Sequence, residues 1–118
     1  MKFMIMLFEK DTDWQAAPPE ELEAALAEHG AFTKMLQDKG IAYSGEAVKD
    51  SGSAVTLRRA GDGDTLTATE GPFAPGQPAQ LAGFYVIDVK DLDEAVEIAR
   101  MCPTGAATEV RPIWESAA

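Results

Sequence analysis

Two apolar segments, far apart in the sequence, restrict the folds that this chain can adopt. Phe3–Phe8 is apolar at every position, and Leu81–Val89 is interrupted by a single charged residue, Asp88. Runs of this length and character are typical of strands at the centre of a sheet, where both faces are covered. The first run is also too short for a transmembrane span or for the core of a secretory signal. The sequence therefore predicts two buried central strands, Lys2–Phe8 and Leu81–Val89.

Two amphipathic helices are predicted between the strands. In Glu20–Asp38 apolar side chains recur at three- and four-residue steps, and Gly40 follows as a helix terminator. Asp91 is a candidate N-cap with Glu94 three residues later, which predicts a second helix that runs to about Arg100. The apolar stripe of each helix is expected to pack on the sheet.

The remaining strands are shorter. They are predicted over Ile41–Val48, Ser53–Arg59, Asp64–Ala68 and Ala107–Ile113. Gly61-Asp62-Gly63 is typical of a hairpin turn and joins the middle two. A loop rich in proline and glycine, Thr69–Gln80, follows the hairpin. Because this loop carries the large apolar ring of Phe73, we expect it to fold back onto the protein.

Without the hairpin, the order of elements is strand–helix–strand–strand–helix–strand, which is the ferredoxin-like split βαβ pattern. We therefore expect an α+β fold with an inserted β-hairpin, in a single domain that spans residues 1–118. The pattern places both helices on one face of an antiparallel sheet, although the central strands are apolar on both faces. A second copy, packed sheet to sheet across a twofold axis, would cover the other face. The sequence thus predicts a homodimer that forms a dimeric α+β barrel.

The charge of the chain argues against some classes of partner. Its net charge at pH 7 is −10, and its ten lysines and arginines form no cluster. A nucleic acid or an anionic membrane would be repelled, so we expect neither as a partner. Cys102 is the one cysteine, which excludes an internal disulfide and suits a reducing compartment. We therefore expect a cytoplasmic protein.

Seven short motifs occur in order along nearly the whole chain. They are Met1-Lys2-Phe3-Met4, His29-Gly30-Ala31-Phe32-Thr33, Ser44-Gly45-Glu46, Glu70-Gly71-Pro72-Phe73-Ala74, Leu81-Ala82-Gly83-Phe84-Tyr85, Leu92-Asp93-Glu94-Ala95 and Glu109-Val110-Arg111-Pro112. Through them the chain resembles the YCII-related proteins, and among these the DGPF-domain group. The resemblance implies a dimeric α+β barrel. Members of the family are mostly uncharacterised; some are linked to extracytoplasmic-function sigma factors, and a His–Asp pair in YCII-type relatives has suggested an enzymatic role.

Two features depart from the family pattern. Glu70 stands where the DGPF signature begins with Asp, and Pro75-Gly76-Gln77-Pro78 replaces a charged continuation that could move protons or bind anions. The resemblance places the histidine of the suspected pair at His29 and its acid partner just before Pro103, where this chain has Cys102. Either the pair is absent, or a Cys–His couple replaces it, since a thiolate beside an imidazole is a competent nucleophile. A lone buried cysteine otherwise acts as a small apolar residue.

His29 and Glu70 are the candidate catalytic residues. His29, the one histidine, lies on the apolar stripe of its helix. It is either a general acid/base, because imidazole titrates near neutral pH, or a half-buried side chain that is hydrogen-bonded to a neighbour. Glu70 is either a base or an acceptor of backbone N–H groups in its own loop. One histidine, one cysteine and scattered carboxylates make no metal-ligand cluster, and no phosphate-binding glycine loop is present, so we expect neither a metal nor an organic cofactor.

The candidate ligand-binding residues are aromatic or polar: Phe73, Tyr85, Glu46, Ser44 and Arg111. Phe73 is either an anchor for its loop or a surface on which a substrate stacks, and the Tyr85 hydroxyl needs a partner that a cleft wall could supply. Ser44 and Glu46 share one face of their strand, which looks either into a cleft or to solvent. Arg111 either pairs with Glu109 or binds an anion.

Two functions are compatible with these residues. In the first, the protein binds a small molecule in a cleft walled by His29, Tyr85 and the Glu70–Phe73 loop, and transfers a proton on an apolar or carboxylated substrate. In the second, it is a non-catalytic regulatory or interaction module that acts through its dimer surface and acidic exterior, in line with the sigma-factor linkage that the resemblance suggests. The sequence alone leaves open whether the protein is an enzyme.

Overall fold

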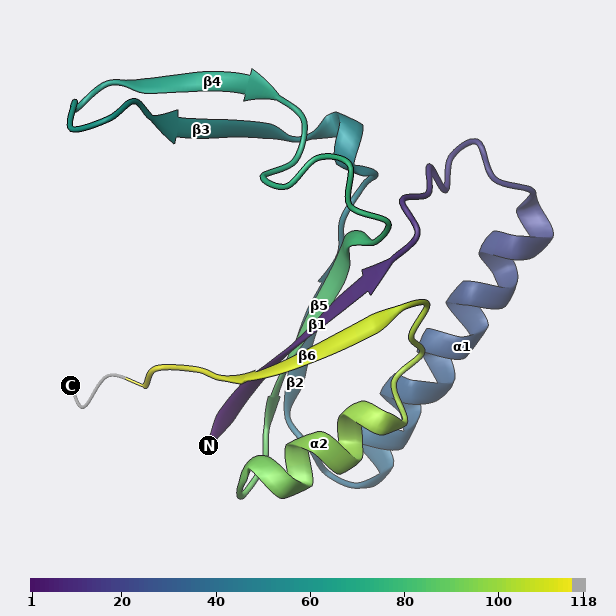
Figure 1. Ribbon diagram of the computed structural model, residues 1–118. Coiled ribbons are helices and arrows are strands. Elements are labelled where there is room, and N and C mark those ends of the chain that lie inside the picture. The colour runs from purple at the N-terminus through teal and green to yellow at the C-terminus, as the bar shows by residue number, and fades with distance from the viewer. Residues whose placement is uncertain (116–118) are drawn as a thin grey trace.

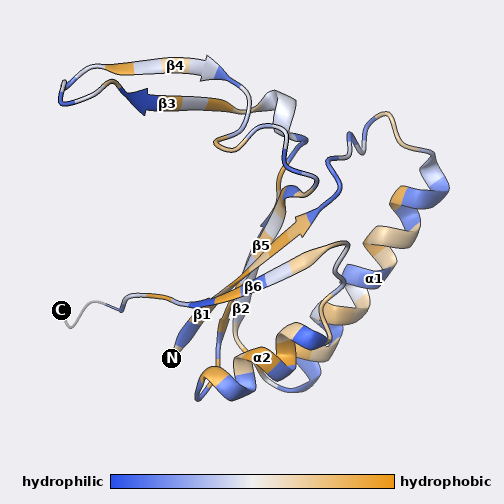
Figure 2. Cartoon of the chain, viewed as in Figure 1, coloured by the Kyte–Doolittle hydropathy of each residue, from blue (hydrophilic) through white to orange (hydrophobic). Residues whose placement is uncertain are grey.

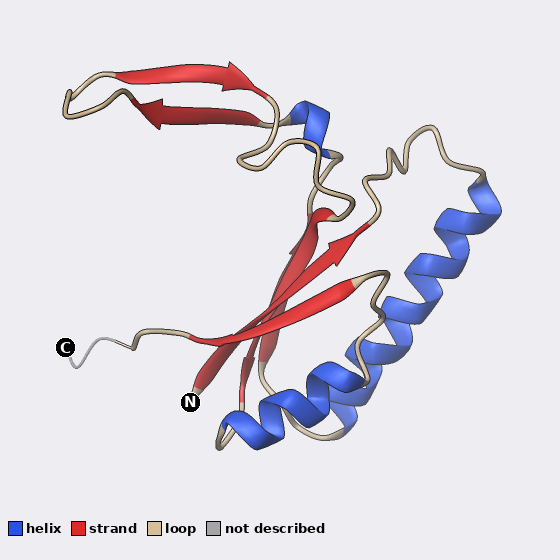
Figure 3. Cartoon of the chain, in the orientation of Figure 1, coloured by secondary structure: helices blue, strands red, loops and turns tan. Residues whose placement is uncertain are grey.

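The fold is a sheet that is covered on one face by two helices. The structure, a computed structural model, describes residues 1–115. Within them, four strands form an antiparallel sheet in the order β2-β5-β1-β6 (Figure 1). These strands and the helices that cover them (Figure 3) are β1 (Lys2–Glu9), α1 (Pro19–Asp38), β2 (Tyr43–Ala47), β5 (Gln80–Asp88), α2 (Leu92–Arg100) and β6 (Ala107–Pro112). This is the ferredoxin-like α+β arrangement that the order of elements predicts.

The core lies between the helices and the sheet. On β1 the side chains of Phe3, Ile5 and Leu7 are buried and point to the helices, as the alternation along a strand requires. They pack with buried residues of the neighbouring elements: Phe32, Leu36, Ile87, Val89, Ala95, Ile98, Ala99 and Cys102. Removal of this apolar set from water is the main favourable term in the folding free energy.

No layer covers the other face of the sheet within residues 1–115. Alternation and strand register place five apolar side chains there, all partly exposed: Met4, Met6, Phe8, Phe84 and Val86. We call this surface the open face. Figure 2 shows the apolar character of β1 and β5, the two central strands. In a single chain these strands are therefore buried on one face and only partly covered on the other.

The helices begin and end where the sequence predicts. Gly40 follows α1 with a left-handed φ of 69°, and Ile41 then donates its N–H to the carbonyl oxygen of Leu36 at 2.9 Å. At the start of α2, Oδ1 of Asp91 accepts the backbone N–H of Glu94 at 2.9 Å, which is the expected N-cap hydrogen bond. These local signals fix the direction in which each helix crosses the sheet.

The remaining two strands, β3 (Val55–Arg59) and β4 (Leu66–Glu70), form a separate hairpin. We call residues 55–70 the arm. A single 3-10 turn, η1 (Ser51–Ser53), precedes it, and the arm projects from the sheet on the side opposite the helices (Figure 1). The radius of gyration is 16.5 Å, whereas roughly 13–14 Å is expected for a compact chain of this length. The arm accounts for this extended shape.

The turn of the arm is longer than predicted. It spans residues 60–65, because Gly61 adopts a left-handed φ of 55° and Gly63 donates its N–H to the Ala60 carbonyl at 3.0 Å before the strands pair. As a result β4 is shifted two residues along the chain. Glu70, which the sequence placed in the following loop, is its last residue. β2 is also shorter than the predicted Ile41–Val48.

Candidate functional site

A cavity of about 310 Å³ lies between α1 and the part of the sheet formed by β2 and β5. Its volume is at the lower end of the range for small-molecule sites. α1 contributes Leu26, His29 and Thr33 to the lining, and β5 contributes Tyr85 among others. The most reactive groups of the lining therefore come from one helix and one strand of the rigid part of the fold.

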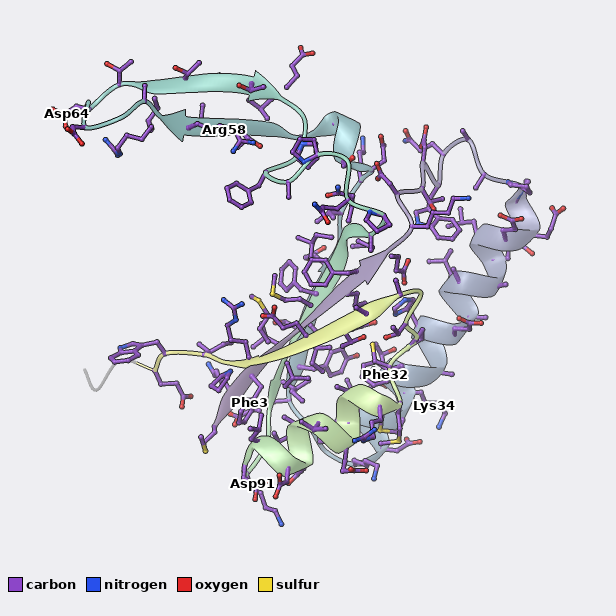
Figure 4. The ribbon with its side chains drawn as sticks, viewed as in Figure 1. Phe3, Phe32, Lys34, Arg58, Asp64 and Asp91 are labelled. Carbon is purple, nitrogen blue, oxygen red and sulfur yellow. The ribbon has the colours of Figure 1, made fainter. Side chains whose placement is uncertain are left out.

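His29 and Tyr85 are joined across this cavity. Nδ1 of His29 lies 2.8 Å from the Tyr85 hydroxyl oxygen, and the two rings lie nearly parallel, with centroids 6.0 Å apart. Phe32, one turn further along α1, contacts the same tyrosine edge-on at 5.1 Å between centroids and points from the helix toward the sheet (Figure 4). The tyrosine ring is thus held between two residues of α1.

The position of Tyr85 determines its protonation. Burial, with smaller contributions from the nearby Cys102 and Tyr43, raises the pKa of Tyr85 to about 12. The phenol therefore keeps its proton at neutral pH and can donate it to Nδ1 of His29. In that arrangement the proton of the neutral imidazole is on Nε2, and the ring presents a hydrogen-bond donor.

Gly45 makes room for the tyrosine ring. It lies opposite Tyr85 in the β2–β5 register. A Cβ atom at this glycine would lie 2.7 Å from Cδ1 of Tyr85 and 2.7 Å from the carbonyl oxygen of Phe84. Any side chain at this position would move the ring or the strand, so the Ser44-Gly45-Glu46 motif has a packing role beside the cavity.

Two carboxylate residues, Glu9 and Glu46, also line the cavity. Glu46 was a candidate ligand-binding residue, but Glu9 was missed, although it ends the apolar run of β1 and is the first charged residue after it. No lysine or arginine is among the lining residues within the described chain. The charged groups at the cavity are therefore acidic.

Four other candidates lie elsewhere. Glu70 and Phe73 are on the arm and its loop, outside the cavity lining; the Phe73 ring is 78% exposed, with the Arg58 guanidinium 5.4 Å from its centre. Arg111 pairs with Glu109 at 2.6 Å, on the strand β6. Ser44, whose neighbours line the cavity, does not itself line it. In a single chain, the expected His29–Glu70 constellation is therefore not assembled.

The comparison with known sequences agrees with the motifs. The sequence model of the YCII-related domain family matches residues 1–117. The chain belongs to the YCII-related family. An uncharacterized protein of Rhizobium meliloti (strain 1021) is 30% identical in an alignment 117 residues long, which covers 96% of this chain and 92% of that protein. The YCII-related family predicted from the motifs is confirmed, and the function of the relative is not known.

Cys102 of this YCII-related protein is a buried thiol. Burial, and then the carboxylate of Glu9, raise the pKa of Cys102 to about 12, so the thiol is protonated at neutral pH. Within residues 1–115 the hydrogen-bond partner of the His29 ring is Tyr85 rather than Cys102. A protonated thiol in the core has the character of a small apolar side chain.

The part of the chain that the structure describes holds neither a metal-ligand cluster nor a membrane-spanning helix. In residues 1–115 no group of three or more His, Cys, Asp or Glu side chains could hold a metal ion. None of the helices there is long and apolar enough to cross a membrane. Within the described residues, the cavity at His29 is therefore the place where ionisable and polar side chains best suited to chemistry come together.

Proposed function

We propose that this YCII-related protein binds a small molecule in the cavity at His29 and transfers a proton on it without a cofactor. The hydrogen bond of 2.8 Å between His29 and Tyr85 carries the proposal. It fixes the orientation of the only imidazole of the chain at the wall of a cavity, as a hydrogen-bond donor to a ligand requires. The ligand-binding residues in this proposal are Tyr85 and Tyr43, with the backbone of Glu46 beside them.

The proposed step moves one proton away from the ligand and supplies one hydrogen bond to it. The carboxylate of Glu9, which lines the cavity, takes a proton from a carbon next to a carbonyl group. Nε2–H of His29 donates to the carbonyl oxygen as negative charge develops there. The carboxylic acid then returns the proton, so the enzyme ends in its starting state. This step assigns to Glu9 the role that the sequence suggested for Glu70.

The charge of the lining favours a particular ligand class. Because the charged groups at the cavity are carboxylates and the chain has a net charge of −10, an anionic ligand would be repelled. The aromatic rings of Tyr43 and Tyr85 suit an apolar body and a cationic group alike. We therefore propose a neutral or cationic ligand in preference to the carboxylated substrate that the sequence also allowed.

We further propose that the protein is a homodimer formed through the open face, as a dimeric α+β barrel. The five partly exposed apolar side chains of the open face support this, since a soluble chain seldom leaves such a surface on its central strands. Light scattering at concentrations from 1 to about 100 μM tests it. A strict monomer throughout would remove the dimer from the proposal.

Three probes of similar shape test the ligand class: benzylamine, benzyl alcohol and benzoate. In amide NMR spectra, we expect the first two to shift signals of lining residues such as Gly45 and Gly83, and benzoate to shift them least. Gly76, which does not line the cavity and has no neighbouring atom within 4 Å of the position of an added Cβ, is the internal control. If benzoate shifts these signals as much as the other two probes, the proposed preference for a neutral or cationic ligand is wrong. Binding in the cavity would then be the part of the proposal that remains.

Hydrogen–deuterium exchange of acetophenone in D₂O tests the proton transfer. We expect the protein to accelerate loss of the methyl protons, and His29→Gln to reduce that acceleration at least tenfold. Glu70→Gln is the matched control, because Glu70 is on the arm, and should keep the full rate. If His29→Gln keeps the rate, the Nε2–H of His29 does not stabilise the developing negative charge.

A non-catalytic interaction module is the second candidate. The exposed apolar side chains of the arm favour it, because they have no role in the cavity. In that case the protein would show no exchange of acetophenone, and loss of the arm side chains would affect assembly alone.

A further inference from the structure

The two faces of the arm differ in chemistry. Cross-strand register places Thr56 and Arg58 on one face with Thr67 and Thr69. The other face carries Val55, Leu57, Leu66 and Ala68 at its centre, with Glu70 at the base and Arg59 at the tip; we call it the apolar face. A two-stranded hairpin with one polar and one largely apolar face normally packs its apolar face on another layer of structure, as each sheet does in a β-sandwich.

The loop after the arm occupies the polar face. The Thr56 hydroxyl donates to the carbonyl oxygen of Gly71 at 2.8 Å, and Nη2 of Arg58 donates to the carbonyl oxygen of Phe73 at 2.7 Å. The Arg58 guanidinium also lies over the Phe73 ring. Figure 4 shows Arg58 on the side of β3 that faces this loop. The Glu70-Gly71-Pro72-Phe73 motif thus closes one face of the arm.

The apolar face has no such cover. Val55 is 62% exposed, Leu57 59% and Leu66 47%. An isolated two-stranded hairpin is at best marginally stable in water, and three exposed aliphatic side chains on one face add an unfavourable hydration term. The apolar face of the arm is therefore typical of a surface that another chain covers.

The base of the arm is fixed to the rest of the protein. Ser51 of η1 donates its backbone N–H to Oδ1 of Asp11 at 2.9 Å, and its hydroxyl donates to Oδ2 of the same carboxylate. Gly71 donates its N–H to the Ala54 carbonyl at 2.7 Å, which extends the pairing of the two strands to the base of the hairpin. An arm with a closed base that is anchored through Asp11 loses less conformational entropy when it docks.

The direction of the arm indicates its partner. It projects from the sheet on the side of the open face, away from both helices (Figure 1). A second copy that packs on the open face would lie within reach, and a twofold axis would place two arms symmetrically. Arg59, at the tip of the apolar face, offers one positive charge to a neighbour with a net charge of −10, whereas the arm as a whole, with Asp62, Asp64 and Glu70, is slightly acidic.

We infer that the arm is an interaction surface for a second copy of this chain, and that Val55, Leu57 and Leu66 pack against that copy. The inference rests on the homodimer proposed above and adds a second contact to it. Each subunit receives the arm of the other, so the dimer is held both by the open faces and by two exchanged arms. The proline- and glycine-rich loop sets the angle of the arm rather than covering the cavity.

Three single substitutions test this inference by sedimentation equilibrium. Leu57→Asp places a charge on the apolar face of the arm, Thr67→Asp places the same charge on its polar face, and Met6→Asp charges the open face. We expect Leu57→Asp to raise the dimer dissociation constant at least tenfold, with Thr67→Asp close to wild type and Met6→Asp monomeric.

The outcomes separate the arm from the dimer itself. If Met6→Asp dissociates the dimer and Leu57→Asp leaves its dissociation constant unchanged, the arm inference is wrong and the dimer stands. If Thr67→Asp weakens the dimer as much as Leu57→Asp, the apolar face is not the contact. A wild-type protein that is monomeric at 100 μM would overturn both proposals.

Hydrogen exchange gives an independent measurement that does not need a variant. Amides of β3 and β4 should exchange several-fold more slowly at high protein concentration than at low concentration, because docking protects the hairpin. Amides of Leu36 and its neighbours in α1 are the internal control, since they are protected within one chain. Exchange in the arm that does not depend on concentration would contradict the inference.

Discussion

Nδ1 of His29 and the hydroxyl oxygen of Tyr85 lie 2.8 Å apart, so one hydrogen bond links α1 to β5 across 56 positions of sequence. This contact has two consequences. It satisfies the hydroxyl of a partly buried tyrosine, which would otherwise destabilise the fold. It also selects which nitrogen of the imidazole carries the proton, and therefore what the ring presents to a ligand in the cavity.

Tyr85→Phe tests this relationship directly. Loss of the hydroxyl should lower the free energy of unfolding by roughly 0.5–1.5 kcal/mol and release Nδ1, so that both neutral tautomers become populated. Because the chain has one histidine, ¹⁵N NMR of the imidazole reports on it without overlap. We expect an Nε2–H tautomer in the wild type. Identical ¹⁵N shifts in the two proteins would show that the hydrogen bond does not set the tautomer.

Gly45→Ala should disturb the same contact from the opposite strand. The new Cβ would lie 2.7 Å from both the Tyr85 ring and the Phe84 carbonyl, so the strand or the ring must move. We expect a loss of roughly 1–3 kcal/mol in the free energy of unfolding, and a change in the His29 ¹⁵N shifts.

Gly30→Ala is the matched control for that substitution. Gly30 is inside α1, and a Cβ built there has no neighbouring atom within 4 Å. Alanine should therefore raise the free energy of unfolding by about 0.5–1 kcal/mol through helix propensity alone. Urea denaturation of both variants measures the contrast; destabilisation by Gly30→Ala, or none by Gly45→Ala, would contradict the packing described.

The sequence predicted most of the main sheet and both helices, because those elements depend on local patterns. Phe3, Ile5 and Leu7 alternate with the side chains of the open face. Asp91 caps α2 by accepting the backbone N–H of Glu94, three residues later in the sequence. The family motifs strengthened these assignments. The placement of His29 on the inward stripe of α1 followed from the same helical spacing.

The composition of the site was harder to predict, because it depends on contacts between distant segments. Tyr85 was expected to need a hydroxyl partner, but no local pattern identifies His29 as that partner. Glu70 and Phe73 were expected at a cleft, and they lie on the arm and its loop because Arg58 of β3 holds the Phe73 carbonyl. That contact joins a strand to a loop. The hydrophobic periodicity of the sequence, which repeats every 2 residues in strands and every 3.6 in helices, does not reveal such a contact.

The thiol of Cys102 should make stability depend on pH in the alkaline range. Its pKa is raised from 9.0 to about 12 in the folded protein, so the folded state holds the proton more tightly than the unfolded chain. The resulting stabilisation is complete below pH 9 and is lost as the pH rises from 9 to 12. We expect a decrease on the order of a few kcal/mol over that interval.

Urea denaturation at pH 8 to 11 of the wild type and of Cys102→Ala measures this effect. The alanine variant should show a smaller decrease, and the part that remains above pH 10 belongs to Tyr85, whose pKa is also raised to about 12. Slopes should be compared rather than absolute stabilities, because the substitution also leaves a small cavity. Equal slopes in the two proteins would place the thiol in a more polar environment than the structure shows.

The core itself should respond in proportion to burial. Leu36 is fully buried between α1 and the sheet, so Leu36→Ala should lower the free energy of unfolding by about 2–5 kcal/mol. Leu92→Ala, at the exposed start of α2, is the control and should change it by less than about 1 kcal/mol. Thermal and urea unfolding of the pair measure the difference, and similar losses would show that Leu92 is covered in solution.

The base of the arm should loosen in acid. Two hydrogen bonds from Ser51 lower the pKa of Asp11 below its ordinary value of 3.8. A carboxyl group whose pKa is lowered in the folded state stabilises the protein at pH values above the pKa of the unfolded state. That contribution is lost as the pH falls through the pKa of the folded state.

Asp11→Asn should therefore speed hydrogen exchange at Ser51 near neutral pH, as acid does in the wild type. Asp13→Asn, in the same loop but bonded to Gln15, is the control and should leave Ser51 unchanged. Slow exchange at Ser51 in Asp11→Asn would mean that other contacts hold the arm in place.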